Sequence, residues 1–97
     1  GSEEFGKGKN FARPVIIIRK LTSDLFLGVP TTTTLRDNNY FHTFQYNNKS
    51  KGIVNSSAMI LQVKTFSIKR LMNRVGMVNQ KDFNLILEKT KKLISPT

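Results

Sequence analysis

The chain has 97 residues and no cysteine, so it has room for one small domain, residues 1–97, and for no disulfide or zinc–thiolate site. Sixteen Lys and Arg against six Asp and Glu give a formal net charge of +10, which favours a polyanionic partner, nucleic acid first. No apolar run approaches the about 20 residues of a membrane span, and the N-terminus does not read as a signal peptide. We therefore expect a cytoplasmic protein that has no membrane partner and that gains stability from dimerisation, because a monomer of this size is marginal.

The first half of the chain reads as a loop followed by short strands. Residues 1–12 contain several glycines and charged residues and are expected to form a flexible loop. Val15–Lys20 opens with four apolar, mostly β-branched residues and reads as a buried strand. Residues 25–30 read as a second strand, which Pro30 ends or places at a sheet edge. Residues 40–46 form the clearest strand, with alternate side chains on opposite faces.

The second half begins with a polar turn over residues 47–52 and returns to extended structure. Residues 58–63 read as a strand that runs on into the next two residues. Ser67 is placed to cap a short helical turn, and residues 75–78 read as a brief extended segment.

The last predicted element is a helix over residues 79–95. Asn79 and Asp82 resemble a capping arrangement at its start. An apolar stripe at helical spacing follows, from Phe83 to Ile94, and indicates a face packed on the core or on a second subunit. Short antiparallel strands with one terminal helix predict a mainly β fold, a small and strongly curved barrel.

Arg13 is the strongest candidate for a functional residue. It stands directly before Pro14, which pushes it towards an extended conformation at the mouth of the first buried strand. A permanently charged guanidinium in such a place is suited to holding a phosphate. If the following turn is centred between Thr22 and Ser23, Arg13 lies opposite Thr32, and opposed residues on antiparallel strands project from the same face. A one-residue slip would put a neighbouring threonine there instead.

Three spaced segments resemble the MazF/PemK toxin family. The segment GSEE…RPVII, within residues 1–17, resembles the family's "GSEQ…RPV" loop-and-strand signature. The segment GVPTTT, residues 28–33, looks like its "(I/V)P-x-T-(S/T)" motif, and ILQVKT, residues 60–65, is similar to its "QV(K/R)(S/T)" motif. Together with the final helix, the resemblance covers nearly the whole chain.

The resemblance implies a PemK/CcdB-like, SH3-like barrel that forms a homodimer and acts as the toxin of a type II toxin–antitoxin pair. It further implies a metal-independent endoribonuclease, without cofactor, that cleaves single-stranded mRNA and is masked by a cognate acidic antitoxin. By position, the family's arginine falls on Arg13 and its catalytic threonine on Thr32. The residues expected to contact RNA are Lys7, Lys9, Thr33, Gln62 and Lys64.

One departure from the family pattern concerns the N-terminus. Family members usually begin with a strand before the Gly-Ser-Glu loop, whereas this chain begins at the loop. A barrel without that strand would expose a sheet edge and have an incomplete, impaired site.

Other readings of the same residues stay open. His42 is the only histidine and can be a packed residue of an aromatic strand or an acid–base group, and Tyr40, Phe41 and Tyr46 can be core residues or can stack on bases. One histidine and six scattered carboxylates do not form a metal site. The alternative functions are a non-catalytic nucleic-acid-binding barrel and a gyrase-binding barrel of the same fold, the latter by analogy alone.

Overall fold

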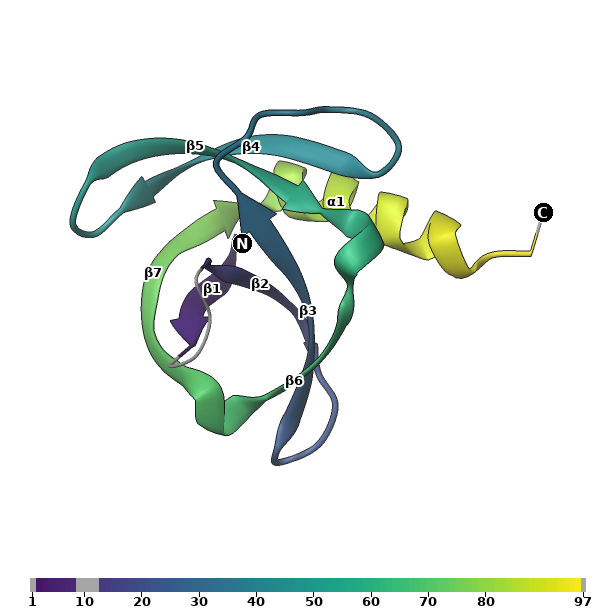
Figure 1. The fold of residues 1–97 in the computed structure, drawn as a ribbon, viewed down its shortest axis with the longest axis horizontal. Helices are drawn as coiled ribbons and strands as arrows, with labels where there is room; N and C mark the ends of the chain where they lie inside the picture. Colours follow the sequence, from purple (N-terminus) through teal and green to yellow (C-terminus); the bar gives the residue numbers. More distant parts are fainter. Residues whose placement is uncertain (1, 9–12, 97) are drawn as a thin grey trace.

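A curled antiparallel sheet makes up most of this computed structural model, which describes residues 2–8 and 13–96 (Figure 1). The elements in chain order are β1 (Ser2–Gly8), β2 (Val15–Lys20), β3 (Leu25–Thr32), β4 (Phe41–Asn48), β5 (Gly52–Met59), the 3₁₀ turn η1 (Ile60–Gln62), β6 (Lys64–Ser67), the 3₁₀ turn η2 (Ile68–Arg70), β7 (Leu71–Asn79) and α1 (Gln80–Ile94). Neighbouring strands pair in the order β4-β5-β3-β2-β1-β7, and β6 also pairs with β3. The predicted mainly β barrel fold with a C-terminal helix is confirmed.

Both faces of β2 are covered, which explains its run of apolar residues. Ile16 belongs to the larger core cluster, where β-strand residues such as Phe44 and Val78 meet Phe83 and Ile86 of α1. Val15, the residue before Ile16, points to the opposite face of the strand and belongs to a second cluster with Phe26 and Phe66. Figure 1 shows the corresponding arrangement: β7, β1, β2, β3 and β6 curl around one interior, and the β4–β5 hairpin lies across the top with α1 beside it. A strand buried on two sides needs β-branched residues at successive positions.

The segment expected to be a loop at the N-terminus is a strand over residues 2–8, so that prediction is wrong. β1 pairs with β7 along its whole length, from Ser2 opposite Asn79 to Gly8 opposite Leu71, and with β2 at Phe5 and Gly6. This segment consequently presents no open sheet edge. Its glycines and charges indicated a loop locally, but pairing on two sides overrides local propensity. The remaining residues of the expected loop, 9–12, lie outside the described residues.

Pro30 does not end its strand, because β3 continues to Thr32. It lies where the partner on one side of β3 changes, from β6, which pairs as far as Gly28, to β5, which begins to pair at Thr31. A residue without a backbone N–H is tolerated at such a gap in the ladder.

The predicted strand over residues 58–63 is also wrong, because β5 ends at Met59 and η1 follows. Ile60 is fully buried, and its backbone N–H donates to the carbonyl of Tyr40, at 2.9 Å, which extends the β4–β5 pairing by one last bond before the chain turns away. The corner turns the chain from β5 into β6. Beyond it, the predicted helical turn after Ser67 is present as η2, although the Ser67 side chain makes no capping bond, and the extended segment at 75–78 belongs to the longer β7.

The C-terminal helix begins where the sequence predicts. The side chain of Asn79 accepts a hydrogen bond from the backbone N–H of Asp82, at 2.8 Å, and donates one to the Asp82 carboxylate, at 2.7 Å. Phe83, Ile86 and Thr90 are buried on the expected stripe, whereas Ile94 at its end is exposed. No helix among the described residues is long and apolar enough to span a membrane.

Replacing the cap residue should destabilise the fold modestly. We expect Asn79→Ala to lower the free energy of unfolding by about 1 kcal/mol, because the first turn of α1 loses its side-chain acceptor. Asn84→Ala is the matched control: Asn84 is exposed and accepts one surface hydrogen bond from Gln80, worth only about 0.2–0.5 kcal/mol. Urea denaturation followed by circular dichroism measures both, and equal losses would contradict the capping role.

Candidate active site

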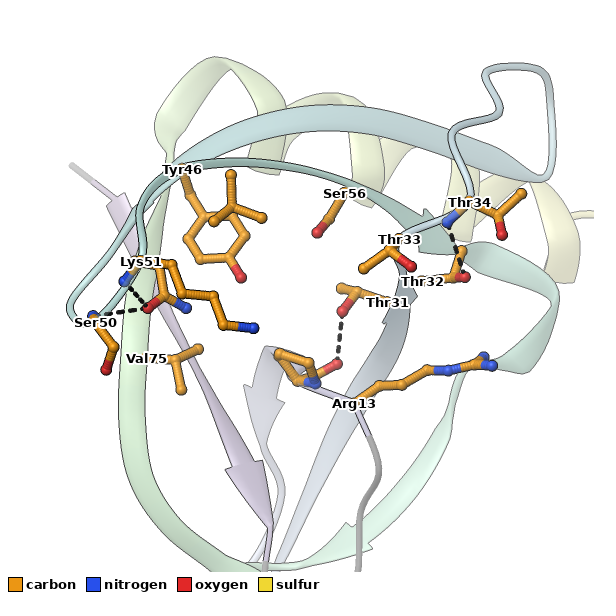
Figure 2. Close-up of a pocket in the computed structure, with 13 residues that line it drawn as sticks. Arg13, Thr31, Thr32, Thr33, Thr34, Tyr46, Ser50, Lys51, Ser56 and Val75 are labelled. Atoms are coloured by element: carbon orange, nitrogen blue, oxygen red, sulfur yellow. Dashed lines mark hydrogen bonds between the residues drawn. The ribbon is translucent and has the colours of Figure 1, made fainter.

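A cleft of about 520 Å³ opens at the end of the β2–β3 hairpin (Figure 2). The residues that line it come from the start of β2, the end of β3, the β4–β5 hairpin and β7. They are Arg13, Pro14, Thr31, Thr32, Thr33, Thr34, Tyr46, Asn48, Ser50, Lys51, Val54, Ser56 and Val75. Both residues predicted to be catalytic, Arg13 and Thr32, thus line one cleft.

The pairing of β2 with β3 brings Arg13 and Thr32 to the same place. Val15 pairs with Pro30 and Ile16 with Val29, and the same register carried two residues further puts Arg13 opposite Thr32. Nearer the turn the pairing is shifted by one residue, with a bulge between Ile17 and Arg19. The predicted register therefore holds at the open end, where it matters for the site.

Thr31 locks this end of the hairpin. It is 2% exposed, and both its backbone N–H and its hydroxyl donate to the carbonyl of Pro14, at 3.0 and 2.9 Å. Neighbours on a strand point to opposite faces, so a buried Thr31 leaves Thr32 turned the other way. Thr31 is therefore a structural residue, whereas its neighbour Thr32 is only half-buried.

Thr32 has a hydroxyl proton that is available to a ligand. Its oxygen accepts a hydrogen bond from the backbone N–H of Thr34, at 3.2 Å. This bond uses a lone pair, so the O–H can donate to a further acceptor. Figure 2 shows Thr32 on the same side of the cleft as the Arg13 side chain.

The segment after Thr32 is anchored on the β4–β5 hairpin. The hydroxyl of Ser57, which is fully buried, accepts from the backbone N–H of Arg36 at 2.9 Å and lies 2.9 Å from the hydroxyl of Thr43. The Thr43 hydroxyl donates to the carbonyl of Arg36 at 2.7 Å. These bonds hold the Arg36 end of the segment that carries Thr33 and Thr34, and so restrict the rim of the cleft.

The guanidinium of Arg13 is exposed and carries a weak intramolecular partner. It donates to the sulfur of Met59 at 3.6 Å, and the side-chain amide of Gln62 approaches the same sulfur at 3.7 Å. A thioether is a weak acceptor. Within the described part of the chain, no carboxylate forms an ion pair with Arg13. Most of its donors are therefore available to an anion.

The other predicted RNA contacts are divided. Thr33 lines the cleft, whereas Gln62 and Lys64 do not. Lys64 lies on β6 and pairs with Gly28 of β3, and its ammonium lies 5.1 Å from the centre of the Phe66 ring. The backbone of Lys7 belongs to β1 and its side chain is not described, and Lys9 is outside the described residues.

His42 lies on a buried network away from the cleft. Its Nε2 is 2.8 Å from the Asp82 carboxylate and its Nδ1 is 3.4 Å from the Lys89 ammonium. Because an ammonium can only donate, Nδ1 accepts and the proton of a neutral ring sits on Nε2. Lys89 also donates to Asp37 at 3.1 Å, and this hydrogen bond lowers the pKa of the Asp37 carboxyl below its ordinary value. The network ties β4 to α1.

Three residues of the cleft were not predicted from the sequence to belong to it: two were not singled out, and the role of the third was left open. Lys51 sits on the turn between β4 and β5, Ser56 lies on β5, and Tyr46 lies on β4. The sequence left Tyr46 as either a core residue or a residue that stacks on bases, and in the structure it is 6% exposed. Only the long-range folding of the hairpin over β3 brings the three together.

Positive charge dominates the lining of the cleft. Of the described residues that line it, Arg13 and Lys51 are charged and none is acidic. Among the described residues, no group of three or more His, Asp or Glu side chains is arranged to hold a metal ion. The cleft thus combines cations and hydroxyls, which suits a phosphate-bearing ligand.

These features agree with a family relationship that the sequence shows. The sequence profile of the PemK-like, MazF-like toxins of type II toxin–antitoxin systems matches residues 2–94. The chain therefore belongs to this toxin family, as the spaced motifs predict. No curated protein matches the chain significantly.

The two neighbouring threonines should respond differently to loss of the hydroxyl. We expect Thr31→Val to lower the free energy of unfolding by about 1 kcal/mol, because a buried hydrogen bond to Pro14 is lost without a change of shape. Thr32→Val, at a half-buried position, should leave the free energy of unfolding within about 0.5 kcal/mol of the original. Thermal and urea unfolding measure both, and a larger loss for Thr32→Val would overturn the division of roles.

Proposed function

We propose that this type II toxin is an endoribonuclease that cleaves single-stranded mRNA without a metal ion. The observation that supports the proposal best is the convergence of Arg13 and Thr32 at the mouth of one basic cleft. The antiparallel register accounts for this convergence, and the family resemblance assigns a catalytic role to the same two positions. A net charge of +10 provides attraction for the RNA backbone.

The reaction is attack by a ribose 2′-oxygen on the adjacent phosphorus. The 2′-hydroxyl loses its proton, the new P–O bond forms, the bond from phosphorus to the 5′-oxygen breaks, and that oxygen gains a proton. The products are a 2′,3′-cyclic phosphate and a 5′-hydroxyl. The RNA supplies its own nucleophile, so the protein must align the groups and stabilise the five-coordinate intermediate.

Arg13 is suited to stabilising the negative charge of that intermediate. A guanidinium is charged at all relevant pH values and can bind two phosphoryl oxygens at once. Its contact with the Met59 sulfur is weak enough to be exchanged for a phosphate. Thr32, whose O–H remains available, donates to a phosphoryl oxygen from the opposite strand.

The same cleft also accounts for how such a toxin is kept inactive. A type II toxin has an antitoxin partner. An acidic antitoxin segment would cover the cleft by competing with RNA for Arg13 and Lys51, the cations that line it. The active form is a cytoplasmic homodimer, which compensates for the small core of a 97-residue chain.

Cleavage in the presence of EDTA is the test of this proposal. Purified protein should cut single-stranded RNA and leave cyclic-phosphate ends, which mass spectrometry identifies. Arg13→Ala should slow cleavage by about 100- to 1,000-fold, as expected for loss of a charge that stabilises the transition state. Thr32→Val should slow it by about 10- to 100-fold, the value of a hydrogen bond to a charged group.

Arg19→Ala is the matched control for the loss of a cation. Arg19 is exposed on β2 beyond the bulge, towards the closed end of the hairpin, and should be dispensable for cleavage. Intact RNA with salt-sensitive binding would contradict the nuclease and support a non-catalytic RNA-binding barrel. Absence of RNA binding at low salt would contradict both.

A further inference from the structure

The cleft has an inner end, away from Arg13 and Thr32, to which the proposed reaction assigns no role. Figure 2 shows the side chains of Tyr46, Lys51 and Ser56 reaching into this part from β4, β5 and the turn between them. Val54 and Val75 line it as well. We call these five residues the inner subsite.

The hydroxyl of Ser56 is the least expected feature of the inner subsite. Ser56 is only 4% exposed, and its hydroxyl makes no hydrogen bond to another described residue. By contrast, the next residue, Ser57, bonds to both Arg36 and Thr43. Among the described residues, no fully buried side-chain oxygen or nitrogen lacks a partner, so the Ser56 oxygen keeps access to the cleft although the residue as a whole is buried. A hydroxyl that no described residue bonds and that opens only into a cleft is suited to a ligand that enters the cleft.

The Tyr46 ring forms a fixed wall beside this hydroxyl. The ring packs directly on Gly76 of β7: a Cβ atom at that position would lie 2.7 Å from the ring. This contact, with 6% exposure, keeps the ring in place. An aromatic wall with two valines nearby favours a flat, partly apolar group, and an unpaired nucleobase is such a group.

Lys51 adds a positive charge at the edge of the inner subsite. The turn that carries it is held by the side chain of Asn48, which accepts hydrogen bonds from the backbone N–H groups of Ser50 and Lys51, at 2.8 and 3.0 Å. The ammonium extends towards the middle of the cleft in Figure 2. From this position it can contact the phosphate that joins one nucleotide to the next.

We propose that the inner subsite binds the base of one unpaired nucleotide and that Ser56 determines which base is preferred. The base lies against Tyr46 and the two valines, the Ser56 hydroxyl bonds its polar edge, and Lys51 holds an adjacent phosphate. This proposal rests on the proposed RNA substrate and adds a specificity-determining residue to it. A hydroxyl can both donate and accept, so it distinguishes bases by the polar group placed against it.

Selection from a randomised pool tests the subsite independently of cleavage. Short 2′-fluoro RNA lacks the attacking hydroxyl, so it reports binding alone. The wild-type protein should enrich one base at one position, and Ser56→Ala should reduce that enrichment by about 3- to 10-fold, the value of one neutral hydrogen bond, with the other positions unchanged. Lys51→Met should weaken binding of all sequences and lower its salt dependence, with the base preference kept.

Matched controls lie at the closed end of the β2–β3 hairpin. Ser23→Ala and Lys20→Met alter exposed residues outside the cleft and should bind like the wild type. Ser56→Ala removes no hydrogen bond within the described chain, so its melting temperature should match that of the wild type.

The outcomes separate this proposal from the proposed reaction. Unchanged enrichment in Ser56→Ala, or wild-type binding with no base preference at any position, would overturn the base subsite even if the protein cleaves RNA. Loss of enrichment in Ser56→Ala would support the subsite even if no cleavage is found. Failure of the wild type to bind any member of the pool at low salt would overturn it as well.

Discussion

The pair of hydrogen bonds from Thr31 to the carbonyl of Pro14 is the constraint on which the site depends. One comes from the backbone N–H and one from the hydroxyl, and Thr31 is 2% exposed. They fix the register at the open end of the β2–β3 hairpin, so that the residue before Pro14 and the residue after Thr31 face each other. A slip of one residue would turn Thr32 to the other face and separate it from Arg13.

The rest of the fold holds this hairpin in place. β2 is buried on both faces, so the larger cluster with α1 and the smaller one with Phe26 and Phe66 both resist a shift of the strand. On the far wall, the hydroxyls of Ser57 and Thr43 tie the segment after β3 to the β4–β5 hairpin. The two walls of the cleft thus come from separate parts of the chain, each fixed by its own contacts, which is a suitable basis for binding an ordered ligand.

Sequence reasoning succeeded where the signal is local. The β-branched run of Val15–Lys20 predicts β2 to the residue, and the pair Asn79 and Asp82 predicts the start of α1. The register of the hairpin was also predicted at its open end, although the bulge between Ile17 and Arg19 was not. A bulge depends on how the strand fits the sheet and leaves no clear mark in a short sequence.

Where partners distant in sequence decide the outcome, the sequence was misleading. Residues 2–8 look like a loop and form a strand because β2 and β7 pair with them on both sides. Ser56 looks like any polar residue of a strand, and only the pairing of β5 with β3 and β4 places its hydroxyl at the cleft. Lys64 lies on β6 against the Phe66 ring and outside the lining of the cleft, so its predicted contact with RNA stays a prediction.

The central claim is that Arg13 and Thr32 hold one phosphate between them, and nuclear magnetic resonance tests it directly. Isotope-labelled protein is titrated with a short 2′-fluoro oligonucleotide while the Arg13 side-chain N–H and Thr32 methyl signals are followed. The account predicts that these two signals shift together, with the same dissociation constant and among the largest changes in the protein. Unchanged signals at both residues, with the largest shifts near Lys89 and Lys92 on α1, would place the nucleic acid on another face and contradict the account.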